Sequence, residues 1–401
     1  MTMESKPASF IKTLPSYIRH TFYYDLRAAV LFGVFGGLFF PFMLIVGRKI
    51  GATDIEMALL SASPYLANAF AIFWAEDILG KGRVWYVVWP NAAGRTLLAG
   101  MFFVTDPAYY TALIFVYMLV TAIPFPSYAS IMKTNYPDDM RGRLMSYVRV
   151  ATALFWIISA ALAGWYLEKD TSRYKYLFPT AAVFGALSAL QFGRIKVRGE
   201  KKTRERFSSL SGLAAPFRDR PFLTFLALYS VFEFSLLIAF PVYPIVLVDE
   251  VRISNIAAGI YGALFSGAWL AGFFFWGRFI DRFSMRRTLA AIFLTGCLTP
   301  LIYMLTRNVL ILSLAQLVSG FLFAATELMT YVVITRLAAP KDVPRYMAAS
   351  VAIGGIRGAT APFLGTALYG VSGPLAPFTL SLVLGLAAFT LSQKLPARRD
   401  G

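Results

Sequence analysis

Charged and chemically reactive side chains are scarce in this sequence. Only 15% of the 401 residues are charged, and the chain has a single cysteine, Cys297, and a single histidine, His20. One cysteine excludes an intramolecular disulfide, and so few thiol and imidazole groups leave little that could hold a transition metal. Nor does the lone histidine have the neighbours that an enzyme site requires. We therefore expect no metal centre, no cofactor and no enzymatic activity.

Apolar residues take their place. Hydrophobic residues make up 58% of the chain and aromatic residues 16%, with a mean hydropathy of +0.63, far above the values of soluble domains. A helix needs about 20 apolar residues to cross ~30 Å of hydrocarbon. Twelve such runs occur, at residues 28–46, 57–75, 84–104, 107–132, 144–167, 176–193, 221–248, 253–277, 288–306, 308–335, 346–370 and 371–391. Because the alternation typical of membrane strands is missing, we predict an all-α membrane protein with twelve transmembrane helices.

The twelve runs divide into two similar sets of six. Between them lies the longest polar stretch, 194–220, which carries nine basic and three acidic residues. The pair Phe40-Pro41 recurs as Phe240-Pro241, and "YASIMKTNYPDDMRGR" (128–143) aligns with "YVVITRLAAPKDVPR" (331–345). We predict two pseudo-symmetric six-helix bundles, 1–193 and 221–401, joined by a cytoplasmic linker over 194–220. Residues 9–22 mix aromatic, aliphatic and basic side chains, which predicts an interfacial segment before the first span.

Basic residues predict the orientation of the chain. If the N-terminus is cytoplasmic, that side holds 28 of the 38 lysines and arginines. Lysine and arginine collect in short cytoplasmic loops, so we expect both termini in the cytoplasm. We also expect the protein to lie in a bacterial inner membrane. Topology and contact with anionic lipid also account for the net charge of +17, and we expect no nucleic-acid partner.

One short charged loop carries a family resemblance. Residues 277–287 read "GRFIDRFSMRR", with five charges in eleven residues between two apolar runs. The segment resembles the inner-loop signature of the major facilitator superfamily, at Gly277, Asp281, Arg282, Arg286 and Arg287. The resemblance implies the fold of that family, a transporter that works as a monomer by alternating access, and a gating role for this cytoplasmic loop.

By the same analogy, Asp281 is expected to meet the start of the fifth span. The basic residues there are Arg141 and Arg143. Such a contact would hold the cytoplasmic ends of the two bundles together.

Ionisable residues inside the spans are the strongest functional candidates. Arg95, Arg149, Glu233, Glu327 and Arg357 each cost about 2.5 to 3.5 kcal/mol at a helix centre, so pairing or access to water is expected. Glu233 is the first candidate for proton coupling, or alternatively forms a structural ion pair with Arg357. Glu327 is a second proton site or the partner of Arg357. Arg149 is expected to snorkel to the interface, and Arg95 to hold helices together.

Further residues are candidates to line a substrate cavity. They lie on the fourth, seventh and tenth spans, which line the central cavity in the family. Together with Arg357 and Arg149 they are Tyr117, Thr121, Tyr128, Tyr229, Thr330 and Tyr331.

The most specific function that these features predict is secondary transport of a small molecule. Since no nucleotide-binding loop is present, an ion gradient would supply the energy, with protons favoured over sodium by analogy. Export of amphiphilic compounds is slightly preferred. The alternative is uptake or exchange of a small organic anion bound by Arg357 and Arg149. The remaining alternative is a membrane sensor or enzyme that uses a transporter scaffold.

Overall fold

The computed structural model describes residues 14–70, 83–122, 131–197, 216–339 and 342–394. All regular structure in these ranges is helical. The first half contains the α-helices α2 (Ser16–Lys49), α3 (Asp54–Phe70), α5 (Arg83–Leu97), α6 (Pro107–Ala122), α8 (Asp138–Glu168) and α9 (Tyr174–Phe192), with the short 3-10 helices η2 (Leu98–Phe103) and η3 (Thr171–Arg173).

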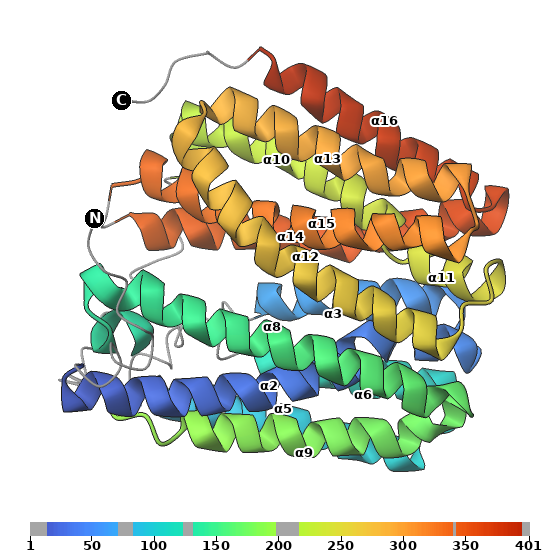
Figure 1. The fold of residues 1–401 in the computed structure, drawn as a ribbon. Coiled ribbons are helices and arrows are strands. Elements are labelled where there is room, and N and C mark those ends of the chain that lie inside the picture. The colour runs from blue at the N-terminus through green and yellow to red at the C-terminus, as the bar shows by residue number, and fades with distance from the viewer. Residues whose placement is uncertain (1–13, 71–82, 123–130, 198–215, 340–341, 395–401) are drawn as a thin grey trace.

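The second half has the same plan. Its helices are α10 (Arg220–Ala239), α11 (Val242–Asp249), α12 (Asn255–Arg282), α13 (Met285–Leu305), α14 (Val309–Leu337), α15 (Val343–Ser372) and α16 (Leu375–Ser392). Figure 1 shows the two halves as two groups of helices lying against each other. We call the end at which α2 begins and α16 ends the terminal end, and the opposite end the distal end.

The twelve predicted spans all correspond to helices. Eight described stretches are long and apolar enough to cross a membrane: α2, α8, α10 with α11, and each of α12 to α16. The other four predicted spans correspond to α3, α5 with η2, α6 and α9. Parts of the second and fourth predicted spans lie outside the described residues.

Helix packing confirms that the halves are pseudo-symmetric. In the first half α2 packs on α8 and α9, α5 on α9 and α6, and α3 on α6. The equivalent helices of the second half make the same five pairings, namely α10 on α15 and α16, α13 on α16 and α14, and α12 on α14. Between the halves, α8 packs on α12 and α3 packs on α15, which is again an equivalent pair. A duplicated six-helix unit accounts for this pattern.

The halves touch at the distal end and separate toward the terminal end. Glycines on α12 report the separation, because a Cβ atom built on each would meet α8 at a different distance. A Cβ atom at Gly259 would lie 2.4 Å from the Ala160 carbonyl oxygen, and one at Gly267 would lie 3.8 Å from Ile157. A Cβ atom at Gly277 would have nothing within 4 Å. Figure 1 shows the same divergence of α8 and α12. In this structure the interface between the halves is therefore closed distally and open at the terminal end.

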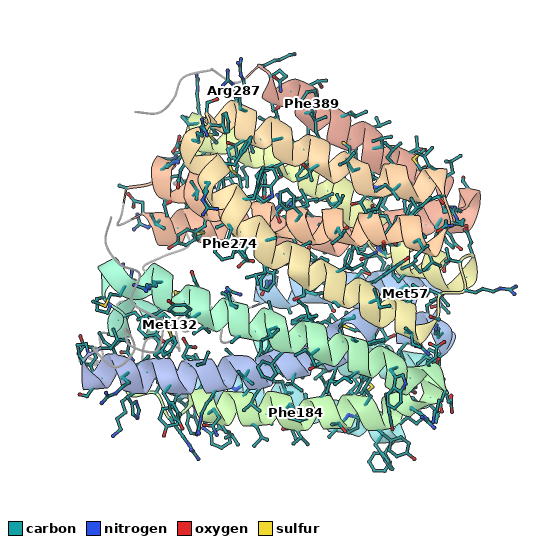
Figure 2. All side chains as sticks on the ribbon, in the orientation of Figure 1. Met57, Met132, Phe184, Phe274, Arg287 and Phe389 are labelled. Atoms are coloured by element: carbon teal, nitrogen blue, oxygen red, sulfur yellow. The ribbon has the colours of Figure 1, made fainter. Side chains whose placement is uncertain are left out.

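The apolar core divides in the same way. At the distal end a single cluster, which includes Met57 and Ile245, joins side chains of both halves. Nearer the terminal end each half has a cluster of its own. The cluster of the first half contains Met132 (Figure 2), and that of the second half contains Phe225. Because membrane helices are held together mainly by close van der Waals packing, this shared cluster holds the two halves together at the distal end.

Two local predictions need correction. Residues 16–22, expected to lie along the membrane surface, instead form the first turns of α2, where Ile18 and Phe22 are buried. They pack with Tyr136 and Leu144, so tertiary contacts outweigh their interfacial composition. Residues 9–13 of that segment lie outside the described residues. The recurring Phe-Pro pair is also not equivalent in the two halves, because Pro41 lies inside α2 whereas Pro241 separates α10 from α11.

A bulky side chain at Gly259 should push the distal interface open. The Cβ of Gly259 would also lie 3.1 Å from the Cα of Gly164, so leucine fits there only if α8 and α12 move apart. We expect Gly259→Leu to raise severalfold the labelling, by a membrane-impermeant maleimide, of a cysteine placed at Asn255, in a Cys297→Ser background. Asn255 is only 4% exposed in the closed interface.

The matched control is Gly142→Leu, because nothing lies within 4 Å of a Cβ at Gly142 on α8. This control should leave labelling unchanged. Equal labelling of the two variants would contradict close packing at the distal end.

Candidate functional site

A partly buried ion pair lies in the middle of the second half. Glu233 is the fourteenth residue of α10 and Arg357 the fifteenth of α15, and these helices pack together. Arg357 donates through Nη2 to Glu233 Oε2 and through Nη1 to Ser230 Oγ at 2.5 Å. The Arg357 side chain is 8% exposed and the Glu233 side chain 26% exposed. The predicted pairing is thus present, and it cancels two charges that would each be costly at this depth.

The first half covers this pair with Tyr65 of α3. A Cβ atom at Gly358, next to Arg357, would lie 2.0 Å from the Tyr65 Cβ, so a glycine is required for the two helices to approach. Tyr65 also packs on Ile238 and Ala361 of the second half. The ion pair therefore lies against the interface between the halves, where relative movement would change its surroundings.

A second pair joins the two halves directly. Arg149 of α8 approaches Glu327 of α14, with Nη2 and Oε1 at 3.5 Å. The two side chains are 43% and 40% exposed. The Arg149 guanidinium carbon lies 5.5 Å from the Trp269 ring centroid and 6.0 Å from that of Phe273, both on α12. The Arg149 cluster comprises Arg149, Trp269, Phe273, Phe323 and Glu327.

This pairing corrects two predictions. Arg149, expected to snorkel to the interface, instead contacts Glu327 of the other half. Glu327 is not the partner of Arg357, because Glu233 occupies that guanidinium. Glu327 instead contacts Arg149 and accepts a 3.4 Å hydrogen bond from Trp269 Nε1.

Most of the aromatic and hydroxyl candidates make packing contacts or hydrogen bonds within their own half. The Tyr229 hydroxyl donates to the Thr326 carbonyl at 3.0 Å, and Tyr117 is buried against Phe35 and Phe39. Thr121 and Thr330 donate to carbonyls in the preceding turns of their own helices. Tyr331 differs, since 63% of it is exposed. Tyr128 lies outside the described residues.

The predicted contact of the charged loop is not made in this structure. Asp281 is exposed, and no hydrogen bond or ion pair joins it to Arg141 or Arg143 within the described residues. Arg141 donates to the carbonyls of Lys133 and Tyr136, in its own half. The physical reason is the separation of α8 and α12 at the terminal end, which keeps the two motifs apart.

Arg95 acts as predicted, joining two helices. It is 8% exposed and donates from Nη1 to the Gly185 carbonyl of α9 at 2.8 Å. Its guanidinium carbon lies 5.0 Å and 5.3 Å from the ring centroids of Phe32 and Phe35. These contacts lie wholly inside the first half, away from the interface.

Sequence reasoning missed a polar network at the distal end. Arg48 of α2 donates to Asp249 of α11 at 2.5 to 3.0 Å and to Asp54 at 3.0 Å. Lys49 donates to the Asn255 side chain at 2.8 Å, and the backbone amide of Ile256 donates to a Glu168 oxygen at 2.9 Å. The distal network comprises Arg48, Lys49, Asp54, Glu168, Asp249, Asn255 and Ile256. The only signal in the sequence was the presence of charges at the outer ends of several spans.

A buried carboxylate was missed as well. Asp25 is 2% exposed in the first third of α2 and accepts a 3.0 Å hydrogen bond from the Tyr136 hydroxyl. It lies three residues before the first predicted apolar run, where a charge seemed to belong to the flanking tail. The greater length of α2 places it inside the bundle.

These features define a class of protein: a two-bundle helical membrane protein with paired charges at the interface of its halves. Comparison by sequence agrees. A family model described as Major Facilitator Superfamily matches residues 26–245 and 228–400. The chain belongs to this superfamily and is a membrane transporter, not an enzyme. A sequence search of curated proteins finds no match.

Solved transporters have a similar fold. A bacterial homologue of the human lysosomal transporter Spinster, in an inward-facing and unoccupied conformation, has a TM-score of 0.67 at 14% identity, over 95% of this chain and 98% of that one. The human organic anion transporter MFSD10 has a TM-score of 0.66 at 14% identity, over 95% and 100%. The nucleoside transporter NupG has a TM-score of 0.65 at 12% identity, over 94% and 98%. At these identities the likeness establishes the fold.

Proposed function

We propose that the protein is a proton-coupled secondary transporter that exports small amphiphilic molecules by alternating access. The observation that carries this proposal is the half-exposed Arg149 cluster, which contains a cation, an anion and aromatic faces between two halves that are closed on one side. In alternating access the halves rock about such a central site, and the site opens to one side at a time. The protein acts as a monomer.

The terminal end is assigned to the cytoplasm of a bacterial inner membrane. The junctions of α12 with α13 and of α14 with α15 lie at this end, as does the start of α8, and the adjoining helix ends all contain arginine. Under the positive-inside rule both termini are then cytoplasmic, and the conformation described here opens inward. Export would begin from this state, with cargo entering from the cytoplasm or the inner leaflet.

Proton coupling is assigned first to Glu233. Uptake of a proton would remove its charge and release the Arg357 guanidinium, which would change the contact with Tyr65 across the interface. Movement of one charge through the membrane potential is worth ~2.3 kcal/mol per 100 mV, enough for modest accumulation. Glu327 is the second proton site, and sodium is the alternative ion.

Flux measurements in proteoliposomes test this function. We expect uptake of the lipophilic dye rhodamine B to follow an imposed pH gradient and to collapse with it. Glu233→Gln should abolish the gradient-driven component, because glutamine cannot exchange a proton. Arg307→Gln is the matched control, since it breaks an exposed ion pair with Glu250 inside the second half. Equal flux with and without the gradient would refute proton coupling, and no flux would refute this cargo class.

Transport of a small organic anion is the competing function. Arg357 is nine-tenths buried and paired with Glu233, so Arg149 is the guanidinium better placed to receive an anion. Counterflow of benzoate that is lost in Arg149→Gln but insensitive to Glu233→Gln would favour this alternative.

A further inference from the structure

We propose that the Arg149 cluster binds a zwitterionic amphiphile. The anionic group of this ligand would bind Arg149 and its cationic group would bind Glu327. Its apolar body would pack on the aromatic residues of α12 and α14. This assignment rests on the transport function proposed above and specifies the class of cargo.

The hydrogen-bonding capacity of Arg149 is unused. A guanidinium carries five N–H donors, and charge-assisted bonds to carboxylates are typically 2.7 to 2.9 Å long. The contact with Glu327 is longer, at 3.5 Å, and Arg149 donates no hydrogen bond within the described part of the chain. Arg357, in contrast, donates to both Glu233 and Ser230. Arg149 is therefore held near its partner by charge while its donors remain available to a ligand.

Glu327 has acceptor capacity to spare. Its Oε2 accepts one long hydrogen bond from Trp269 Nε1, at 3.4 Å, and its Oε1 faces Arg149. A carboxylate has about four lone-pair sites, so a ligand ammonium group could add two or more bonds. The contact between Arg149 and Glu327 is long, and at least 40% of each side chain is exposed, so a ligand that pairs with both side chains can replace it without leaving either charge unpaired.

Aromatic faces border both charges. The Trp269 ring lies beside the Arg149 guanidinium, and its centroid is 6.4 Å from that of Phe323, which is 50% exposed. Phe273 packs edge-on against Trp269, with a centroid separation of 5.3 Å. A flat apolar group can pack on these rings, and cation–π contacts add attraction for an ammonium group.

Charge balance favours a zwitterion over a simple ion. A bound anion would pair with Arg149 and leave Glu327 unpaired, and a bound cation would do the reverse. At membrane depth an unpaired charge is costly. A ligand with both charges satisfies both side chains and keeps the site neutral. Because Arg149 and Glu327 belong to opposite halves, such a ligand would also bridge them and favour closure at the terminal end.

Binding of four probes with the same ring system tests this inference. The probes are 2-naphthylalanine, 3-(2-naphthyl)propionate, 2-(2-naphthyl)ethylamine and 2-(2-naphthyl)ethanol, used in equilibrium dialysis against the full-length protein in detergent. We expect 2-naphthylalanine to bind about tenfold more tightly than the propionate and the amine, which each lack one charge-assisted contact, and more tightly still than the alcohol, which lacks both.

Variants of Arg149 and Glu327 show which charged group of the ligand each side chain binds. Arg149→Gln should weaken binding of 2-naphthylalanine and the propionate about tenfold and strengthen binding of the amine, which then no longer leaves an arginine unpaired. Glu327→Gln should weaken binding of 2-naphthylalanine and the amine about tenfold and strengthen binding of the propionate, which then no longer leaves a glutamate unpaired. Arg149→Lys should lie between the wild type and Arg149→Gln, because lysine keeps the charge without the planar fork. Arg307→Gln is the control for loss of an arginine elsewhere.

Equal affinity for all four probes, undetectable binding of 2-naphthylalanine, or an Arg149→Gln variant that binds it normally would each overturn the inference. Thermal unfolding of every variant checks that a loss of binding is not a loss of folding. Rhodamine B flux under a pH gradient is read out separately. Gradient-driven flux with any of these binding results would retain the proposed transport function and refute only the zwitterion site.

Discussion

Replacement of Arg357 by methionine is expected to destabilise the protein by about 3 kcal/mol or more. The guanidinium is 8% exposed and pairs with Glu233, so its removal strands a carboxylate inside the second half. Adding Glu233→Gln to this variant should restore most of the loss, because no buried charge is then left unpaired. The measurement is a double-mutant cycle of thermal unfolding in detergent, followed by tryptophan fluorescence.

The Arg307–Glu250 pair provides the control cycle. Its charged atoms are 2.6 Å apart, but the side chains are 37% and 33% exposed, so Arg307→Gln should change stability by less than about 1 kcal/mol. Simple additivity of the Glu233 and Arg357 substitutions would mean that the two side chains do not interact in the folded protein.

The helices and the division into halves could be predicted because hydrophobic length is a direct consequence of the membrane. The positions of the helix ends could not, since capping and tertiary contacts set them. Helix α14 begins after Asn308, whose side chain accepts hydrogen bonds from the amides of Leu310 and Ile311. Helix α8 begins six residues before the apolar run that marks it.

The ionisable candidates were found from insertion cost, which depends only on position along a helix. Their partners depend on which helix faces meet. The pair of Glu233 and Arg357 was among the predicted alternatives because both lie at mid-depth in helices of one half. The pair of Arg149 and Glu327 crosses the interface, and its contact depends on how the halves are docked. A single sequence holds no direct record of that docking.

The conformation of the protein explains why the predicted contact of Asp281 is absent. The expected contact of Asp281 with the start of α8 requires the terminal end to be closed, whereas this structure is closed at the distal end. The distal network was overlooked because charges at helix ends are ordinary in membrane proteins. Only the fold brings Arg48 to Asp249, 201 residues later in the chain.

Locking the distal end should stop transport altogether. Lys49 of α2 and Asn255 of α12 belong to different halves, and their side chains are joined by a 2.8 Å hydrogen bond. Cysteines at these two positions, in a Cys297→Ser background, can be joined by a short methanethiosulfonate cross-linker. A covalent link keeps α2 beside α12 and prevents the outward opening that alternating access requires. Reduction of the cross-linker removes the constraint.

The measurement is rhodamine B flux in proteoliposomes before cross-linking, after cross-linking and after reduction, with each single-cysteine variant as a control for the reagent. Rocking of the two halves predicts that flux falls to the background of empty vesicles when the link forms and returns on reduction. Undiminished flux through the fully cross-linked protein would contradict it, because cargo would then cross without the distal interface ever opening.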